Sequence, residues 1–376
     1  MIPYGRQFLD KDDIEGVVEA LKSDYLTTGP KVQEFESAFA SKVGSKYAVA
    51  VSSGTAALHL SCLAAGLKPG EESITSPITF VASANCALYC GARPVFSDVG
   101  DDGLIDTDQI GKNISRKTKV LIPVHYSGTP CDMEGIKEIA DKNNLITIED
   151  AAHALGAKYN KTNIGDCTYS DMTIFSFHPV KHITTGEGGM ITTNSRELYE
   201  KLSVLRSHGI TKSPEMLVRK NEGRWYQEMQ ELGFNYRITD MQCALGLSQL
   251  KKLDQFVKRR QEIARRYDDA FGGDDNISIR KAQKDRSNAY HLYVIRVRDA
   301  GTRLKLFERL WAAGILCQVH YLPVYLHPYY EKLGYKKGLC PNSERFYEGI
   351  ISLPIYPSLS EVDQDYVISV VKGFFR

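Results

Sequence analysis

Short apolar runs alternate with amphipathic stretches along the first two-thirds of the chain. Four of these runs are rich in Val and Ile and show no long polar alternation, namely Tyr47–Val51, Lys119–Val124, Leu145–Ile148 and Met172–Phe177. Strands buried on both faces have this pattern, and a parallel sheet covered by helices is its usual context. We therefore expect such a sheet, with a further strand at Met190–Thr193.

Helical patterns separate these strands. In the clearest of them, Leu60, Leu63, Ala64 and Leu67 repeat at the spacing of one helix face, and Pro69 follows as a stop signal. Strands that alternate with helices in this way predict an α/β fold with a mainly parallel sheet.

A long helical pattern starts near Asp240 and runs to Phe271, where a Gly-Gly-Asp-Asp sequence ends it. Beyond it the patterns predict a strand at Tyr290–Val297, a helix at Thr302–Ala313, a strand at Ile315–His320 and a helix after Ser360. We predict a large domain over residues 1–248 and a small C-terminal α/β domain over residues 249–376, bridged by the long helix. The polar segment Thr211–Gln230 has no clear period and is either a mobile flap or a surface loop.

The charges of the chain nearly cancel, because 47 Lys and Arg face 46 Asp and Glu and leave a net charge of +1. A protein without an overall field has no general attraction to nucleic acid or to anionic membranes, so neither is expected as a partner. No apolar stretch approaches the ~18 residues of a membrane span, and the N-terminus lacks the apolar core of a signal peptide. The 8 cysteines are scattered without a CxxC pair, which indicates free thiols in the cytoplasm.

Polar clusters follow three of the predicted strands, at the edge where open α/β sheets place their ligands. In the first, Ser52–Leu58, a strand runs through Ser-Ser-Gly-Thr into a helix. The free N–H groups there suit a phosphate, although Ser and Thr are also ordinary helix caps. In the second, Glu149–His153, a carboxylate could hold a cationic ring nitrogen, a metal or only a loop. Spacing alone favours a structural role, because acids are common at the ends of strands.

The third cluster, Phe175–Gly189, places Lys181 between an apolar strand and a glycine-rich turn. A desolvated lysine has a lowered pKa and becomes a competent nucleophile. We expect Gly186, Gly188 and Gly189 to make room around it. A phosphate-binding turn, then an acid, then a lysine is the order that an enzyme dependent on pyridoxal 5'-phosphate (PLP) needs. In such an enzyme the lysine forms the Schiff base and the acid keeps the pyridine nitrogen protonated.

These segments resemble the DegT/StrS family of fold-type I nucleotide-sugar aminotransferases, which depend on PLP. The resemblance covers essentially the whole chain and is carried by Leu26–Pro30, Ser52–Leu58, Asp150–His153, Phe175–Gly189, Arg206–Gly209, Gly233–Arg237 and Gln318–Tyr321. It implies a homodimer in which L-glutamate supplies the amino group for a nucleotide-linked 4-keto-6-deoxy sugar. The expected substrate is UDP-2-acetamido-2,6-dideoxy-beta-L-arabino-hex-4-ulose, as in pseudaminic acid biosynthesis.

The resemblance also implies roles for single residues. Lys181 matches the Schiff-base lysine, Asp150 matches the acid at the pyridine nitrogen, and His153 lies near the ring oxygen of the cofactor. Further cofactor contacts are implied for Gly54, Thr55, Ala56, Phe80 and Ser176, and for Asn235 reaching from the partner subunit. Substrate contacts are implied for Tyr4, Asp24, Tyr25, Leu26, Thr27, Gln318, Val319, His320 and Tyr321, and no metal site is expected.

Other functions are open to chains with this resemblance. A sister group of the family removes a sugar hydroxyl and carries histidine where this chain has Lys181, so the lysine argues against that chemistry. The same amino transfer could act on a sugar linked to dTDP, GDP or UDP. A catalytically silent, PLP-binding regulator is a further alternative, and the intact Asp150, Ser176 and Lys181 argue against it. A bare Rossmann module is disfavoured because no GxGxxG follows a strand.

Overall fold

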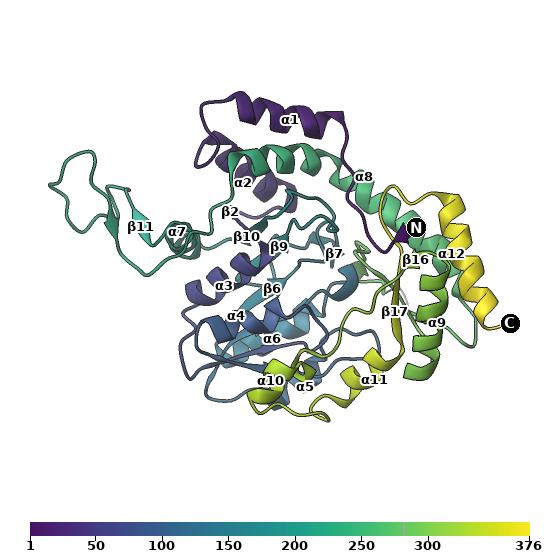
Figure 1. The fold of residues 1–376 in the computed structure, drawn as a ribbon. Helices are drawn as coiled ribbons and strands as arrows, with labels where there is room; N and C mark the ends of the chain where they lie inside the picture. The colour runs from purple at the N-terminus through teal and green to yellow at the C-terminus, as the bar shows by residue number, and fades with distance from the viewer. Residues whose placement is uncertain (281–282) are drawn as a thin grey trace.

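A central sheet of seven strands organises the computed structural model, which describes residues 1–280 and 283–376 (Figure 1). The strand order is β2 (Tyr47–Val51), β10 (Gly189–Thr193), β9 (Met172–Ser176), β6 (Ile146–Asp150), β5 (Thr118–Ile122), β3 (Glu72–Thr75) and β4 (Arg93–Phe96). Strand β10 runs antiparallel to β2 and β9, and the other neighbours pair in parallel. The predicted α/β fold with a mainly parallel sheet is confirmed.

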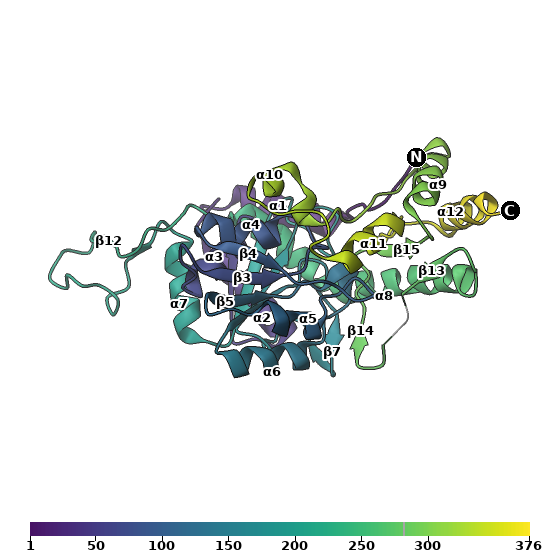
Figure 2. The same ribbon diagram turned by 90° about the horizontal axis from the view of Figure 1, so that it is seen from below.

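Helices bury both faces of this sheet (Figure 2). In β2, Ala48 and Ala50 pack into one apolar cluster, whereas Val49 and Val51 pack into another on the opposite face. Successive strand residues point to opposite faces, so apolar runs without polar alternation are what a doubly covered sheet requires. One face is covered by α2 (Pro30–Val43), α5 (Thr107–Asn113) and α6 (Met133–Asn143), and the other by α3 (Gly54–Ala64), α4 (Ala82–Tyr89) and α7 (Arg196–Leu205).

Helix α8 (Asp240–Phe271) leads from the large core into the C-terminal part of the chain (Figure 1). A capping box fixes its start, because the side chains of Thr239 and Gln242 each accept from the other's backbone N–H. The predicted ends of this helix are confirmed. The predicted boundary between residues 248 and 249 falls inside it, and the division into two domains stays a prediction.

The C-terminal part has its own apolar cluster, to which Ile263 and Tyr267 of α8 belong. Its elements are β13 (Ser278–Ile279), β15 (Tyr293–Arg296), α9 (Ala300–Ala312), β16 (Ile315–Leu316), β17 (Ile350–Leu353) and α12 (Glu361–Phe374). The helices α10 (Pro328–Lys332) and α11 (Pro341–Gly349) return to the large part, where they place Tyr330 and Phe346 in its apolar clusters. Strand β1 (Ile2–Pro3) pairs in parallel with β16, so the first residues join this part, while α1 (Lys11–Lys22) packs on α8. A small sheet of β7 (Lys158–Tyr159), β8 (Thr162–Asn163) and β14 (Arg286–Ser287) links the two parts.

Two predicted strands are shorter than expected. Tyr290 has φ +51°, a left-handed conformation that an extended strand cannot contain, so β15 begins at Tyr293 rather than at residue 290. The strand predicted to reach His320 ends at Leu316, because its partner β1 offers only two residues.

The segment Thr211–Gln230 lies in an arm that projects from the body of the molecule (Figure 1). The short strands β11 (Ile210–Thr211) and β12 (Glu228–Met229) pair across it. At its base two glycines bring the backbones together, because a Cβ on Gly209 would lie 1.7 Å from the carbonyl oxygen of Glu231 and one on Gly233 would lie 2.0 Å from the nitrogen of Gly209. The base therefore excludes every larger residue.

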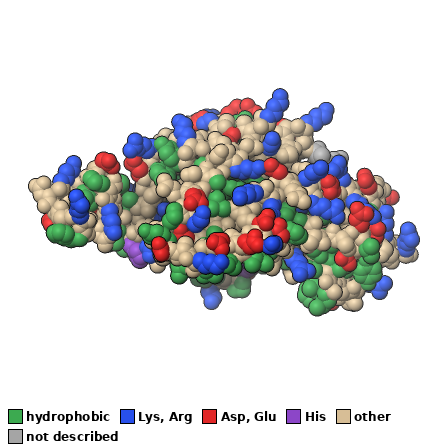
Figure 3. Space-filling model, turned by 90° about the horizontal axis from the view of Figure 1, so that it is seen from above, with side chains coloured by type: hydrophobic (Ala, Val, Ile, Leu, Met, Phe, Trp, Pro, Cys, Tyr) green, Lys and Arg blue, Asp and Glu red, His purple; other side chains and the backbone are tan. Residues whose placement is uncertain are grey.

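Charges of both signs are interspersed on the surface seen in Figure 3, and no extended patch of one sign covers that face. Among the described residues, no helix combines the length and the apolar character that a membrane crossing would need.

Candidate active site

A cavity of about 580 Å³ opens where β6 and β9 end and α3 begins. This is the edge at which open α/β sheets bind their ligands. Ten of the residues singled out in the sequence line it together: Tyr4, Gly54, Thr55, Phe80, Asp150, His153, Ser176, Lys181, His320 and Tyr321. Residues up to 317 positions apart in the chain therefore meet in one site.

The start of α3 offers backbone N–H groups to this cavity. Ser53 caps the helix, and its Oγ accepts from the N–H of Ala56 at 3.1 Å. Gly54 and Thr55 line the cavity next to Ser176, and a Cβ on Gly54 would lie 2.9 Å from the Cβ of Ser176. The glycine thus lets a serine hydroxyl and a helix N-terminus converge, which is a geometry suited to a phosphate group.

Asp150 ends strand β6 with its carboxylate in the cavity. The side chain is 5% exposed, and its Oδ2 accepts a hydrogen bond of 2.6 Å from the hydroxyl of Ser83. Its Oδ1 accepts from the backbone N–H of Ala152 at 3.1 Å. With no basic side chain in ion-pair contact among the described residues, the carboxylate is oriented by neutral donors and is free to meet a cationic ligand atom.

Lys181 follows β9 in the loop that leads to β10, and it is partly buried because its side chain faces the cavity. Its Nζ lies 3.3 Å from Nε2 of His291. Removal from water lowers the pKa of the Lys181 amine to about 8, and the positive charge of Arg260 acts in the same direction, whereas Asp150 opposes the change. About a tenth of this amine is therefore neutral near pH 7, far more than for a solvated lysine, and the neutral form is the one that a nucleophile requires.

Imidazole rings gather beside the amine. The ring of His153 lies 4.3 Å from that of His291, and its Nε2 lies 3.2 Å from the hydroxyl of Tyr321. Burial holds the pKa of His153 and of His291 well below the ordinary value, and the nearby charge of Lys181 adds to the effect. Both rings are therefore neutral and can exchange hydrogen bonds with a ligand.

Aromatic side chains close the outer side of the cavity. Phe80 is 57% exposed, and its ring centroid lies 6.4 Å from that of Tyr321. The ring of Tyr4 lies 5.1 Å from that of His320. An exposed phenyl ring above a polar cavity is a suitable surface for stacking on a flat heterocycle.

The other predicted site residues lie outside this cavity. Ala56 is buried in the first turn of α3 and does not line the cavity. Gln318 pairs with Ser352 in an isolated β-bridge, and neither Gln318 nor its neighbour Val319 lines the cavity. The segment Asp24, Tyr25, Leu26 and Thr27 is exposed beside the start of α8. Asn235 is exposed at the base of the arm. The substrate contacts predicted for Tyr4, His320 and Tyr321 thus have a place in the cavity of their own chain, and the remaining contacts stay predictions.

The structural reason for the glycines after Lys181 differs from the one expected. A Cβ on Gly188 would lie 2.2 Å from Thr185 Oγ1, and one on Gly189 would lie 2.5 Å from the carbonyl oxygen of Ser53. Gly186 has φ +80° and open space around it. The expectation that they make room for the lysine was wrong. They let the chain turn back into β10 and pass close to the phosphate-binding helix start.

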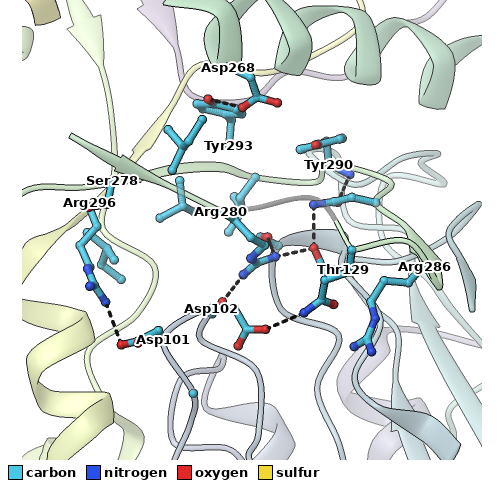
Figure 4. Close-up of a pocket in the computed structure, with 18 of the residues that line it drawn as sticks. Asp101, Asp102, Thr129, Asp268, Ser278, Arg280, Arg286, Tyr290, Tyr293 and Arg296 are labelled. Atoms are coloured by element: carbon cyan, nitrogen blue, oxygen red, sulfur yellow. Dashed lines mark hydrogen bonds and ion pairs between the residues drawn. The ribbon is translucent and has the colours of Figure 1, made fainter. Parts of the chain in front are cut away.

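A larger cavity of about 850 Å³ lies on the boundary between the two parts of the chain, and Figure 4 shows it. Its arginines are already engaged: Arg280 donates to the Ser127 hydroxyl at 2.7 Å and to backbone oxygens, and Arg286 pairs with Asp285 at 2.6 Å. Arg296 lies 3.6 Å from Asp101. No lysine is among the described residues that line it. The side chains of Arg280 and Arg296 connect the two parts across this cavity. The described residues that line it include no amine for the chemistry of Lys181.

Comparison with known proteins identifies the family of this chain. A sequence profile of the DegT/DnrJ/EryC1/StrS aminotransferase family matches residues 7–372. The chain belongs to this family. It is therefore an aminotransferase that depends on PLP, as the sequence predicted. The spore coat polysaccharide biosynthesis protein SpsC of Bacillus subtilis is 42% identical over 100% of this chain and 97% of its own length. The UDP-4-amino-4,6-dideoxy-N-acetyl-beta-L-altrosamine transaminase of Campylobacter jejuni is 39% identical over 98% of this chain and 96% of its own length.

Solved structures of family members have the same fold. PseC of Helicobacter pylori, an aminotransferase involved in the biosynthesis of pseudoaminic acid, superposes with a TM-score of 0.92 at 34% identity, covering 100% of this chain and 99% of its own. The sugar aminotransferase Spr1654 of Streptococcus pneumoniae superposes with a TM-score of 0.93 at 31% identity, covering 100% and 99%. The pneumococcal protein is known with pyridoxamine phosphate, with PLP and without cofactor.

The cavity of this aminotransferase fits PLP. The start of α3 and the hydroxyl of Ser176 would hold the phosphate, and they lie close together because Gly54 carries no Cβ. Asp150, whose carboxylate accepts from neutral donors only, would face the pyridine nitrogen, and Lys181 would supply the amine. Phe80 offers an exposed ring face for the heterocycle.

Sequence analysis missed several residues of the site. Ser83, which orients Asp150, lies on α4 in a run of small residues that indicates only a buried helix. His291 begins a predicted strand, and a histidine there usually belongs to the core. Arg260 lies on α8, where an arginine is expected to face solvent. None of the three carried a local signal, because each meets its partner across more than 60 positions of the chain.

Proposed function

We propose that this enzyme transfers the amino group of L-glutamate to the C4 ketone of a UDP-linked 4-keto-6-deoxy-N-acetyl sugar, UDP-2-acetamido-2,6-dideoxy-beta-L-arabino-hex-4-ulose. The observation that carries the proposal is the convergence of Lys181, Asp150 and the start of α3 in one cavity. The substrate class is supported by the Campylobacter transaminase, which matches over nearly the full length of both chains, and by the fold of PseC.

Each residue of the site has a task in this reaction. When bound, PLP supplies an electron sink and carries the amino group from donor to acceptor. The start of α3 and Ser176 hold its phosphate, and Asp150 holds the proton of its ring nitrogen. The amine of Lys181, neutral in part at pH 7, would anchor the cofactor and would move the proton at C4 of the sugar. Tyr4, as a cavity-lining aromatic residue, is placed to contact the sugar nucleotide.

A second substrate is favoured by a specific observation. SpsC, a spore coat polysaccharide biosynthesis protein, is slightly more identical to this chain than the Campylobacter transaminase is. The same chemistry on another dTDP-, GDP- or UDP-linked keto sugar, one that enters a polysaccharide, is therefore the alternative.

A substrate panel distinguishes the two. The enzyme would be incubated with L-glutamate and with UDP-, GDP- or dTDP-linked 4-keto-6-deoxy sugars, and the amino sugar detected by mass, with the Lys181→Ala variant as control. We expect product from the UDP sugar and none from the variant. Product from the dTDP or GDP sugar alone would overturn the assignment to pseudaminic acid biosynthesis and leave amino transfer intact.

We also propose that the enzyme works as a homodimer in the cytoplasm. Asn235 is exposed and lies outside the cavity of its own chain, which supports a role for Asn235 of the partner subunit at the cofactor phosphate. All 8 cysteines are buried and free, as suits a reducing compartment.

Mixed dimers test the shared site. A dimer of one Asn235→Ala chain and one Lys181→Ala chain has one site with both residues intact. We expect about half of the wild-type activity from such dimers, whereas each variant alone is impaired. If mixing restores no activity, Asn235 acts within its own chain and the proposal of a shared site is wrong.

A further inference from the structure

Arg260 of α8 is a buried cation whose bonds all go to neutral groups. The residue is 1% exposed. Its guanidinium donates to the carbonyl oxygens of Ile355 at 2.9 Å, Tyr290 at 3.2 Å, His291 at 3.4 Å and Val180 at 3.4 Å. Within residues 1–280 and 283–376, no carboxylate lies within ion-pair distance of it, and its Nε has no hydrogen-bond partner.

These four bonds tie together the segments that surround the amine of Lys181. Val180 immediately precedes Lys181, and His291 places its Nε2 3.3 Å from the lysine Nζ. Ile355 donates its N–H to the carbonyl oxygen of Tyr4 at 3.0 Å, and Tyr4 lines the cavity. One side chain on the bridging helix thus fixes cavity segments from both parts of the chain.

The charge of the Arg260 guanidinium, which no carboxylate neutralises among the described residues, affects the protonation of the Lys181 amine. Around the Lys181 amine lie one carboxylate and four imidazoles, namely Asp150, His153, His182, His291 and His320. Burial holds the pKa of all four imidazoles below the ordinary value, so they are neutral at pH 7. Tyr4 and Tyr321 also line the cavity as neutral phenols, and His178 and Glu187 line it as exposed residues that solvent screens. Burial and the charge of Arg260 favour the neutral form of the Lys181 amine, whereas Asp150 favours its protonated form.

We propose that Arg260 is a positioning residue, which holds Lys181 against His291 and favours the neutral form of the lysine amine. The proposal rests on the role of Lys181 given above and adds the group that sets its proton state. In the tautomer of His291 that carries its proton on Nδ1, Nε2 accepts an N–H of the neutral amine, whose lone pair then stays free for the cofactor. A buried cation without a carboxylate is costly, and such groups persist where the surrounding structure or the function requires them.

The test is the titration of Lys181 in the cofactor-free protein, a state in which the pneumococcal relative is known to fold. Trace acetylation from about pH 6 to about pH 11, read by mass spectrometry on the peptide that holds Lys181, reports the neutral fraction of its amine. Arg260→Gln keeps two amide N–H donors and removes the charge. We expect labelling of Lys181 at about pH 7 to fall about threefold or more, with the midpoint moving to higher pH.

Arg259→Gln is the matched control, because Arg259 is the next residue on the helix and bonds to Leu359 and Glu262 away from the cavity. It should leave the labelling of Lys181 unchanged. Arg260→Lys keeps the positive charge with fewer N–H donors, so the midpoint of Lys181 labelling should stay at the wild-type pH. If Arg260→Gln does not fold, the labelling of Arg260→Lys tests the proposal in its place. An unmoved midpoint in folded Arg260→Gln, an equal shift in Arg259→Gln, or a raised midpoint in Arg260→Lys would overturn the proposal.

This outcome is separate from that of the proposed function. Failure to transfer an amino group to any sugar in the panel would defeat the proposed function. An enzyme that transfers the group, with a Lys181 titration indifferent to Arg260, would defeat only the present inference.

Discussion

Replacing Lys181 by Met should stabilise the cofactor-free protein at neutral pH and abolish its activity. The amine has a pKa of about 8 in the folded chain against an ordinary 10.5. At neutral pH the amine is therefore harder to protonate in the folded chain than in the unfolded chain. At about 1.36 kcal/mol for each pKa unit, this difference lowers the free energy of unfolding by about 3 kcal/mol. Because the side chain is partly exposed to the cavity, we expect about 2 kcal/mol. Met retains an unbranched chain of similar length without the charge.

The sign of the pH dependence follows from proton binding. Between about pH 8 and pH 10.5 the unfolded chain binds more protons at Lys181 than the folded chain does, so wild-type stability rises with pH across this window. Below about pH 8 the wild type carries the full cost, and above pH 10.5 it carries none. The advantage of Lys181→Met should therefore be constant below the window and disappear across it.

Urea unfolding followed by circular dichroism measures this advantage at several pH values, at one protein concentration because an oligomer's stability depends on it. The loss of the contact with His291 lowers the stability of the variant by a constant amount, about 1 kcal/mol, so the change with pH is the informative quantity. Lys46→Met, at an exposed lysine, controls for the loss of a positive charge. A difference between wild type and Lys181→Met that stays flat from about pH 7 to pH 10.5, or grows with pH, would refute the reasoning.

Three further substitutions test the site. Lys181→Arg keeps a charge but cannot supply a neutral amine, so steady-state turnover should fall by at least about 100-fold, and near wild-type turnover would contradict the role of the lysine. Ser83→Ala removes the hydrogen bond of 2.6 Å to Asp150 and should lower kcat about tenfold, with unchanged kcat as the contrary result. Gly54→Ala would place a Cβ 2.9 Å from that of Ser176, so cofactor affinity in a fluorescence titration should fall at least about tenfold, whereas Gly111→Ala, in open space, should leave it unchanged.

The sheet and the bridging helix were predictable because their patterns are local. A strand covered on both faces needs apolar residues at every position, and β2 has them in Ala48, Val49, Ala50 and Val51. The capping residues Thr239 and Gln242 likewise mark the start of α8 in the sequence itself. Asp150 and Lys181 could be found for a related reason, since a polar residue directly after a buried strand lies at the ligand-binding edge.

The rest of the site depends on contacts that no local pattern records. His291 reaches Lys181 across 110 positions, and it does so because Tyr290 adopts a left-handed turn that the strand pattern hides. Arg260 reaches Val180 across 80 positions from a helix whose other arginines, such as Arg259 and Arg266, pair with acids nearer the surface. Hydrogen bonds to backbone carbonyls cannot be predicted from residue types, because every residue has a backbone carbonyl.

The measurement that tests the central claim most directly is the position at which the cofactor is fixed. The wild-type enzyme would be loaded with PLP, reduced with borohydride, digested and sequenced by mass spectrometry. The account predicts that the cofactor is recovered on one peptide, attached to Lys181, and that the Lys181→Ala protein yields no labelled peptide although it keeps Gly54, Thr55 and Ser176 for the phosphate. Attachment to a different lysine would contradict it, as would amino transfer at near the wild-type rate by the Lys181→Ala protein.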